Sequence, residues 1–215
     1  MNIERATGIV LRVRPLTDTS LIAHWLTADL GRLATVAKGA RRPKSPFRGQ
    51  IDLFHLAEIS FARSRRSELH TLREVRLLES HSALRLELDW LQQASYCSTL
   101  IEQTTETESP LPALFDQFKS LLQELPRHPA RAATIFAFEM KLLDELGLKP
   151  DLAETALSAG SRQLLEKFVV TDWPALFRLV LSVGQRVEIN KFLHGFLIYH
   201  LGKFPRGREA ALATA

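Results

Sequence analysis

Apolar and polar positions alternate with a period of two in the first part of the chain. From Leu11 to Arg14, the apolar Leu11 and Val13 alternate with Arg12 and Arg14, so the two arginines share one face of a predicted strand. Pro15 and the polar residues after it end this run. Further stretches are bounded by turn residues in the same way. We expect strands at residues 7–14, 21–27, 32–38, 51–61 and 68–77.

Five short strands with no obvious helix between them are typical of a small barrel. Closure of the sheet also removes the exposed strand edges that promote aggregation. The sequence therefore predicts a barrel domain at residues 1–80.

The period changes after the predicted barrel. Leu84, Leu88 and Leu91 fall on one helical face, although Leu84, Leu86, Leu88 and Trp90 also alternate as in a strand. The apolar pattern continues for well over about twelve residues, and this length favours a helix.

The remaining pattern is helical. Helices are predicted at residues 111–125 and 130–146, and Gly147 follows the second where a C-cap belongs. Residues 171–174 are predicted to cap and begin another helix, because Pro174 suits a first turn. Asn190 is the expected N-cap of a last helix, which Gly202 and Pro205 end. Residues 81–215 are therefore predicted to form a helical domain, which makes the fold class α+β.

Charge divides along the same boundary. Residues 1–80 carry 14 Lys and Arg against 8 Asp and Glu, a net charge of +6, whereas residues 81–215 carry 14 against 16, a net charge of −2. A basic first part and a slightly acidic second part indicate two surfaces with different partners, the basic one suited to a polyanion.

Several classes of protein are excluded by what the sequence lacks. A single cysteine, Cys97, excludes an internal disulfide framework and a multi-cysteine zinc site, and we expect it to be a packing residue. The sequence contains no phosphate loop, dinucleotide-binding motif, nucleophile elbow or zinc-protease motif. His194 and His200 lie on different sides of a helix. With no signal peptide and no apolar span, we expect a soluble, cytoplasmic protein that is not an enzyme and needs no cofactor.

The strongest positive signal is a basic loop. Five cations lie between residues 38 and 48, and no acid occurs between Asp29 and Asp52. Between residues 37 and 49, two prolines and two glycines prevent regular structure, so the charges are predicted to lie on an open loop that binds phosphates. The five cations are Lys38, Arg41, Arg42, Lys44 and Arg48.

Other residues extend this predicted DNA-binding surface. Arg63, Arg65 and Arg66 form a second basic turn, and Arg12 and Arg14 are expected on the barrel face between the turn and the loop.

Two aromatic residues lie among these cations. Phe47 and Phe61 are positioned to stack on unpaired bases or to fill the core, and core is the stronger interpretation for Phe61. The alternative for the whole surface is a set of ordinary solubilising loops.

A second cluster lies near the C-terminus. Cations there neighbour phenylalanines, and an apolar groove rimmed by cations suits an acidic, hydrophobic peptide tail. The alternative is an amphipathic helix that packs on its own core. The candidate residues for the partner peptide are Lys191, Phe192, Phe196, Lys203 and Arg206.

Short motifs along most of the chain resemble the bacterial RecO family of recombinational-repair proteins. Each motif alone is weak, but the segment from Lys38 to Arg42 is fairly specific in this context. The motifs are Gly8–Leu11, Leu30–Leu33, Ala37–Arg42 with Ser45, Arg48 and Gly49, Phe138–Leu143 with Leu146–Leu148, Pro150–Leu152 and Tyr199–Lys203.

The resemblance implies an N-terminal OB-fold, a helical C-terminal region and binding of single- and double-stranded DNA. It also implies annealing of complementary strands and work with RecR and RecF to load RecA onto DNA coated by single-strand-binding protein, whose acidic tail is recognised. A nucleoid-associated location in the cytoplasm follows. Many relatives carry a four-cysteine zinc module after the position of Leu152, whereas residues 151–167 here contain no cysteine, so zinc is expected to be absent.

Other functions remain open from the residues alone. An RNA-binding OB module would use the same loop, since nothing in the sequence distinguishes a 2′-hydroxyl. A non-enzymatic adaptor would present the loop to an acidic protein surface. A hydrolase has no motif to support it.

Overall fold

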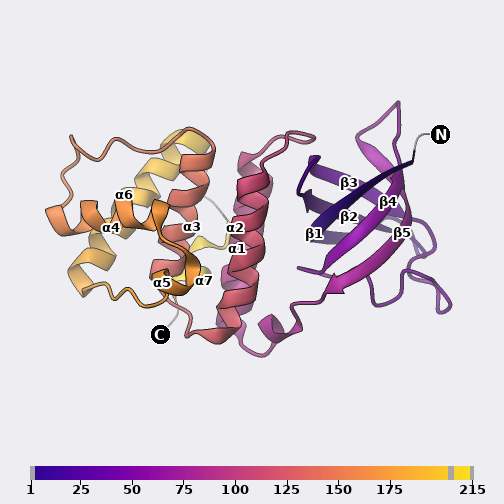
Figure 1. The fold of residues 1–215 in the computed structure, drawn as a ribbon, viewed down its shortest axis with the longest axis horizontal. Coiled ribbons are helices and arrows are strands. Elements are labelled where there is room, and N and C mark those ends of the chain that lie inside the picture. The colour runs from indigo at the N-terminus through magenta and orange to yellow at the C-terminus, as the bar shows by residue number, and fades with distance from the viewer. Residues whose placement is uncertain (1–2, 203–205, 214–215) are drawn as a thin grey trace. The chain divides into compact units, whose positions relative to one another are not determined.

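The computed structural model describes residues 3–202 and 206–213 (Figure 1). The chain divides into two compact units, one of Met1–Ser82 with Thr105–Lys119 and one of Ala83–Thr104 with Ser120–Ala215. The first unit contains all five named strands. They are β1 (Ile3–Pro15), β2 (Leu21–Thr27), β3 (Gly31–Ala37), β4 (Leu56–Ala62) and β5 (Leu69–Glu79).

The strands form a closed barrel in the order β1-β2-β3-β5-β4. Neighbouring strands are antiparallel except β3 and β5, which are parallel. This is the OB-fold, so the predicted fold class is confirmed. Two predicted starts were wrong. The first strand begins at Ile3 and not at Thr7. The fourth begins at Leu56 and not at Ile51, because residues 51–55 form turns in which Phe54 has a φ of 65°.

Alternate residues of the strands fill the barrel interior. Trp25, Leu33 and Phe61 are buried there, and the indole Nε1 of Trp25 donates a hydrogen bond of 2.9 Å to Thr35 Oγ1. The polar atom of the largest core side chain is thereby satisfied, which removes the cost of burying it.

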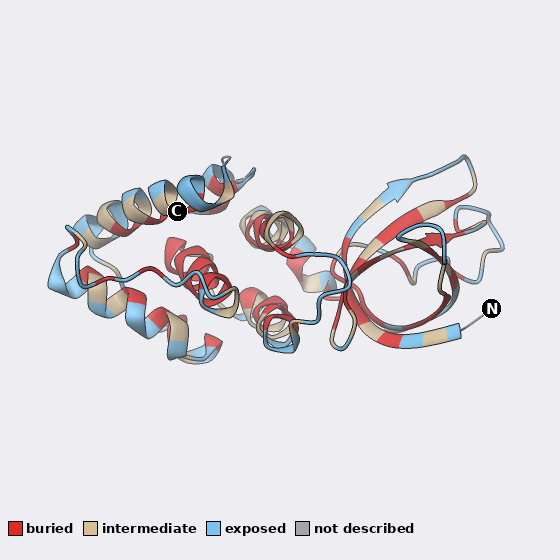
Figure 2. Cartoon of the chain, turned by 90° about the horizontal axis from the view of Figure 1, so that it is seen from above, coloured by how far each residue is buried: buried red, intermediate tan, exposed pale blue. Residues whose placement is uncertain are grey.

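The second unit is helical, and the boundary between the units falls inside α2. The helix α3 (Ala132–Glu145) is buried over most of its length, from Ala132 to Leu143 (Figure 2). The helical elements of the chain are η1 (Ser82–Arg85), α1 (Leu88–Thr104), α2 (Pro112–Glu124), η2 (Leu125–Arg127), α3 (Ala132–Glu145), α4 (Ala159–Val170), α5 (Trp173–Leu176), α6 (Val183–Leu201) and α7 (Arg208–Leu212).

Local capping explains where the last long helix begins. Ser182 and Gln185 form a capping box at the start of α6, so the prediction of Asn190 as the N-cap was wrong. Asn190 instead lies inside α6, where its side chain accepts a hydrogen bond from Arg208. Gly202 ends the helix with a φ of 64°, as expected of a left-handed C-cap.

A buried ion pair ties α7 to α3. Arg208 Nε and Nη2 donate to the two carboxylate oxygens of Glu139 at 2.7 and 3.0 Å, and Tyr96 donates to the same carboxylate at 2.6 Å. Burial and the adjacent carboxylate raise the pKa of Tyr96, so its phenol stays protonated and remains a donor. A buried charge pair requires all its partners, because either charge left alone is costly.

We expect Arg208→Ala to lower the free energy of unfolding by about 3–5 kcal/mol, because Glu139 would remain buried without its cation. Arg206→Ala is the matched control, since Arg206 is exposed and lies two positions earlier. It should change stability by no more than about 0.5 kcal/mol. Denaturant unfolding measures both, and equal reductions in the two variants would contradict the role assigned to the pair.

Candidate nucleic-acid interface

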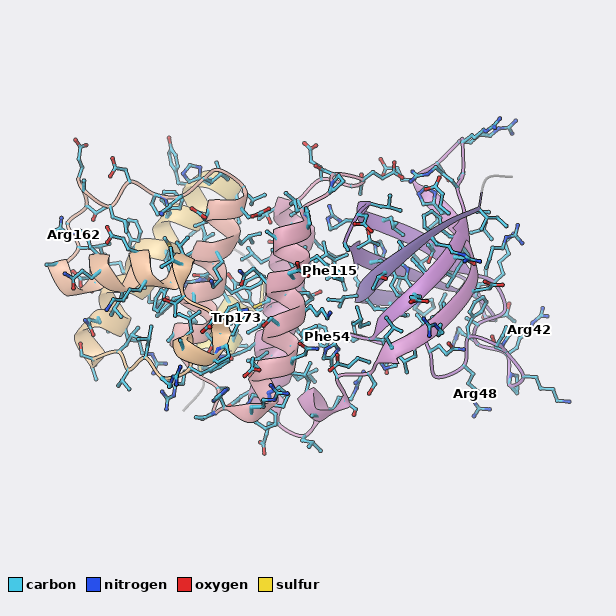
Figure 3. All side chains as sticks on the ribbon, viewed as in Figure 1. Arg42, Arg48, Phe54, Phe115, Arg162 and Trp173 are labelled. Carbon is cyan, nitrogen blue, oxygen red and sulfur yellow. The ribbon has the colours of Figure 1, made fainter. Side chains whose placement is uncertain are left out.

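Residues 38–50, here called the basic loop, follow β3 and present the five predicted cations. Lys38, Arg41, Arg42, Lys44 and Arg48 are all exposed, and none of them forms an ion pair with a carboxylate within the described part of the chain. Figure 3 shows Arg42 and Arg48 extending away from the barrel. The positive charge of the loop is therefore available to an external anion.

The basic loop is anchored in the barrel. Ala40, Phe47 and Ile51 are at most 9% exposed and belong to the barrel core. Burial of a phenylalanine side chain stabilises the folded state by roughly 1.5–3 kcal/mol, so Phe47 holds the basic loop against the barrel. Phe47 and Phe61 are thus core residues, and the structure does not expose either ring for stacking on a base.

Hydrogen bonds join the basic loop to the β1–β2 turn. The Arg41 backbone N–H donates to Thr19 O at 3.0 Å, and Arg41 Nη1 donates to Thr17 O at 3.2 Å. Arg48 Nη1 donates to Pro43 O at 3.2 Å within the loop. These acceptors are neutral carbonyls, so they orient the guanidinium groups without cancelling their charge.

A second group of cations lies on β1 and β3, on either side of His24 of β2. In the register of β1 and β2, Arg12 lies opposite His24 and Arg14 lies opposite Ile22. His24 carries a pKa lowered to about 4, first by burial and then by the charges of Arg12, Arg14 and Arg32. Arg12 lies opposite His24 in the strand register, and Arg32 lies on β3, the strand on the other side of β2, so cations of β1 and β3 flank His24.

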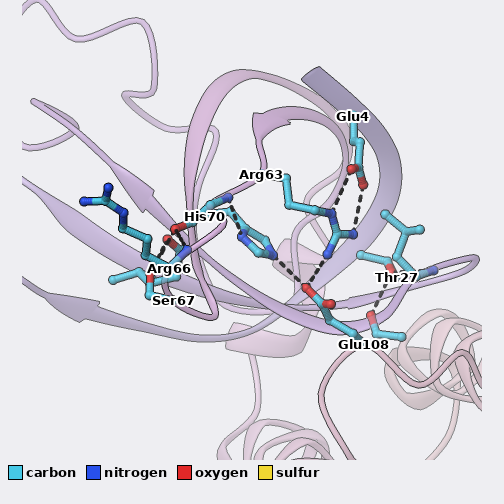
Figure 4. A network of polar contacts seen from close by, with 11 residues as sticks. Glu4, Thr27, Arg63, Arg66, Ser67, His70 and Glu108 are labelled. Atoms are coloured by element: carbon cyan, nitrogen blue, oxygen red, sulfur yellow. Dashed lines mark hydrogen bonds and ion pairs between the residues drawn. The ribbon is translucent and has the colours of Figure 1, made fainter. Parts of the chain in front are cut away.

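The predicted second basic turn joins β4 to β5, and its members differ. Arg65 and Arg66 are exposed, whereas the guanidinium of Arg63 forms ion pairs with Glu4 at 2.7 Å and Glu108 at 2.5 Å (Figure 4). Both carboxylates raise the pKa of Arg63. Arg63 is thus neutralised by its own chain in this structure.

Strand register places this turn and the basic loop at opposite ends of the barrel. The basic loop leaves the end of β3 at Ala37, whereas the turn precedes Leu69, which pairs with Ala34 in the parallel β3–β5 ladder. Glu108, which contacts Arg63, also bonds to the backbone of Arg32 at the start of β3. A strand of seven residues at about 3.3 Å per residue separates its ends by roughly 20 Å. The predicted cations therefore form two sites with the β1–β3 face between them.

Comparison with known proteins matches both parts of the chain. Residues 1–81 match the family described as "Recombination protein O N terminal", and residues 85–158 match "Recombination protein O C terminal". The DNA repair protein RecO of Symbiobacterium thermophilum is 34% identical over 182 residues, which are 82% of this chain and 69% of that protein. The chain belongs to the RecO family.

Other RecO proteins match over a smaller share of their length. The DNA repair protein RecO of Idiomarina loihiensis is 37% identical over 142 residues, 65% of this chain and 59% of that protein. The one from Rhodopirellula baltica is 33% identical over 143 residues, 66% of this chain and 53% of that protein. This RecO chain thus spans between half and two thirds of the length of these two relatives.

The structure also places the predicted partner-peptide residues of the RecO chain. A groove lies between α6 and α7. Phe192 and Phe196 pack against each other, with ring centroids 6.0 Å apart, and neither of them lines this groove. Lys191 does line that groove, and Arg206 is exposed. Lys203 lies outside the described residues.

Sequence reasoning missed the residues that shape this groove. It has a volume of about 690 Å³, and its apolar wall includes Val183 and Val187, which are 82% and 63% exposed. Arg186 lies beside them and donates to Leu212 O at 2.8 Å. His24 was missed as well, although its place between Ile22 and Leu26 on one face of a predicted strand was available as a signal.

Metal-ligand clusters and membrane spans are both absent from the described residues. These residues contain no group of three or more His, Cys, Asp or Glu side chains able to hold a metal ion. None of the described helices combines the length and hydropathy of a membrane-spanning segment.

We expect His24 to titrate with a pKa of about 4, well below the ordinary 6.5. As pH falls from 6.5 toward 4, the unfolded chain takes up a proton that the folded barrel does not, so His24 contributes stability above pH 6.5 that is lost in this window. Arg14→Gln should raise the pKa of His24, because it removes one nearby cation. An NMR titration of the imidazole measures this shift.

Arg76→Gln is the control for the His24 titration. Arg76 lies on β5 and pairs with Glu58, so its replacement should leave the pKa of His24 unchanged. An equal response of His24 to both variants would show that Arg14 has no local effect.

Proposed function

We propose that this RecO chain is a non-enzymatic DNA repair and recombination protein whose barrel binds the phosphate backbone of DNA. One observation carries the proposal: five exposed cations, which form no ion pair with any described carboxylate, lie on a loop anchored in the barrel core. Each Lys or Arg that neutralises a phosphate releases counterions, which favours binding. The DNA-binding surface consists of Lys38, Arg41, Arg42, Lys44 and Arg48 with Arg12 and Arg14, and Arg65 and Arg66 contribute at the other end of the barrel.

This surface suits backbone contact more than base recognition. Its cations are exposed, while Phe47 and Phe61 are buried, so neither ring offers a platform on which a base could stack. Phosphate contacts position nucleic acid without reading base order. The RecO chain is therefore proposed to bind both single- and double-stranded DNA.

Annealing of complementary strands follows from the same chemistry. Two strands repel each other through their phosphates, and a basic surface that neutralises part of this charge lowers the repulsion. Base pairing then supplies the free energy, so the reaction needs no cofactor. The proposed cellular role is to help RecR and RecF load RecA onto DNA coated by single-strand-binding protein.

We expect the double variant Arg41→Ala/Arg42→Ala to weaken DNA binding across all sequences. Its salt dependence should also flatten, because the slope of log K against log salt changes by about 0.7 for each phosphate of a single strand that the protein no longer neutralises. Fluorescence anisotropy of labelled oligonucleotides at several salt concentrations measures both effects.

The matched control for this variant is Arg178→Ala/Arg206→Ala. These two arginines are exposed in the helical unit, so the net charge changes equally without touching the barrel. An unchanged salt slope in Arg41→Ala/Arg42→Ala, or an equal weakening in the control, would refute the assignment. Preference for a matched RNA oligomer in competition would favour the RNA-binding alternative.

The groove between α6 and α7 is proposed to receive the acidic tail of single-strand-binding protein. Val183 and Val187 offer apolar contact. Arg186 and Lys191 supply two positive charges to the lining against the one negative charge of Glu209. Arg208 also borders the groove, but Glu139 neutralises it. A hydrophobic, acidic peptide complements this combination of apolar wall and cationic rim.

We expect Val187→Glu to weaken binding of that tail by roughly tenfold or more, because a carboxylate in the groove repels an acidic peptide. Tyr199→Glu is the control on the same helix, since Tyr199 is 84% exposed and does not line the groove. Titration of a fluorescent tail peptide measures both variants. Equal weakening would place the peptide elsewhere.

A further inference from the structure

The carboxylate of Glu108 lies between two hydrogen-bond donors of the barrel. Its Oε1 accepts from Arg63 Nη1 at 2.5 Å and from His70 Nε2 at 2.9 Å (Figure 4). The Glu108 side chain is 42% exposed and that of Arg63 is 30% exposed, so solvent reaches this position. A single oxygen atom thus accepts two convergent hydrogen bonds at an open place on the surface.

The two donors are held in place without Glu108. Glu4 accepts from Arg63 Nε and Nη2 at 2.7 and 2.9 Å, which leaves Nη1 directed toward Glu108. His70 is 2% exposed and stacks on Phe61, with ring centroids 5.3 Å apart. The Ser64 backbone N–H donates to His70 Nδ1 at 3.3 Å, so Nε2 carries the proton. The donors therefore form a prebuilt anion site.

Glu108 itself is held with local strain. Its φ is 57°, in the left-handed region that non-glycine residues rarely adopt. Its backbone N–H donates to Arg32 O at 2.8 Å, and Gly31 admits the neighbouring Ser109, whose O would lie 2.2 Å from any added Cβ. These backbone contacts do not depend on the carboxylate. The Glu108 side chain can therefore leave the donors while its segment stays on the barrel.

We propose that Arg63 Nη1 and His70 Nε2 form a binding site for one backbone phosphate of nucleic acid, and that the Glu108 carboxylate competes with phosphate for these donors and keeps the site closed in the wild type. The inference rests on the proposed function of the barrel and adds a regulated contact to it. A phosphate oxygen accepts the same charge-assisted hydrogen bonds as a carboxylate oxygen. Arg65 and Arg66, exposed in the same turn, attract the adjoining phosphates.

The test compares Glu108→Gln with Glu106→Gln. Glutamine keeps the size and the acceptor oxygen but removes the charge that competes with phosphate. Glu106 lies two positions earlier and is exposed, so its variant matches the charge change away from Arg63 and His70. The measurement is the salt dependence of binding to a thymidine oligonucleotide, read by fluorescence anisotropy.

One additional phosphate contact should steepen the slope of log K against log salt by about 0.7 in Glu108→Gln. Glu106→Gln should keep the wild-type slope. Adding Arg63→Gln to Glu108→Gln should return the slope to the wild-type value. Equal slopes in the two glutamine variants would overturn the proposal.

A second readout follows the anion site without DNA. In NMR spectra of the Glu108→Gln variant with isotope-labelled histidine, the His70 imidazole signals should shift on titration with inorganic phosphate. The same signals of the wild type and of Glu106→Gln should not shift. A shift with inorganic phosphate but no change in the DNA slope would overturn the assignment to a nucleic-acid backbone.

Failure of this inference is separable from failure of the proposed function. If Arg41→Ala/Arg42→Ala weakens DNA binding while Glu108→Gln behaves like Glu106→Gln, only the regulated site is wrong. If Arg41→Ala/Arg42→Ala binds DNA like the wild type, the proposed function fails at its main surface.

Discussion

The structure of the candidate DNA-binding surface depends on burial, in the barrel core, of two residues of the basic loop and of the residue that follows it. Ala40, Phe47 and Ile51 belong to the same buried cluster as Trp25 and Phe61. Their burial fixes a loop that has no regular secondary structure, and it orients the exposed cations outward. A flexible loop would lose conformational entropy on binding a phosphate chain. Because the buried residues already fix the loop, the entropy lost on binding is smaller.

Ion pairs with carboxylates of the same chain determine which cations remain available to an external anion. The side chains of Arg41 and Arg48 donate to neutral carbonyl oxygens, whereas Arg63 binds Glu4 and Glu108. All three are arginines in predicted basic segments. Their availability to DNA therefore depends on neighbouring carboxylates that approach only in the folded chain.

In the helical unit, a buried polar cluster positions the groove. Arg208 binds Glu139 and Asn190, and it thereby holds α7 beside α6. The exposed Val183 and Val187 of α6 line the groove that results. The ion pair of Arg208 and Glu139 fixes the position of α7 more than it adds net stability, because desolvation of the two charges offsets much of their attraction.

Local patterns in the sequence determined much of the fold. Alternation in Leu11–Arg14, turn residues between strands and the change of period beyond residue 80 predicted a barrel followed by helices, and the basic loop was visible as charge without acids. Capping at Ser182 was missed, because Asn190 has an equally good capping side chain and only the packed helix excludes it. The α4 helix was missed too, since its apolar pattern is weak.

Tertiary structure alone decided which distant residues meet. Glu4, Arg63, His70 and Glu108 converge from four separate segments, and Arg12 meets His24 only through the register of β1 and β2. The sequence by itself determined the class of fold and the position of the basic loop, because periodicity and local charge are properties of neighbouring residues. The pairing of cations with carboxylates and the place of the groove were decided by the folded chain, because they depend on contacts between residues far apart in sequence.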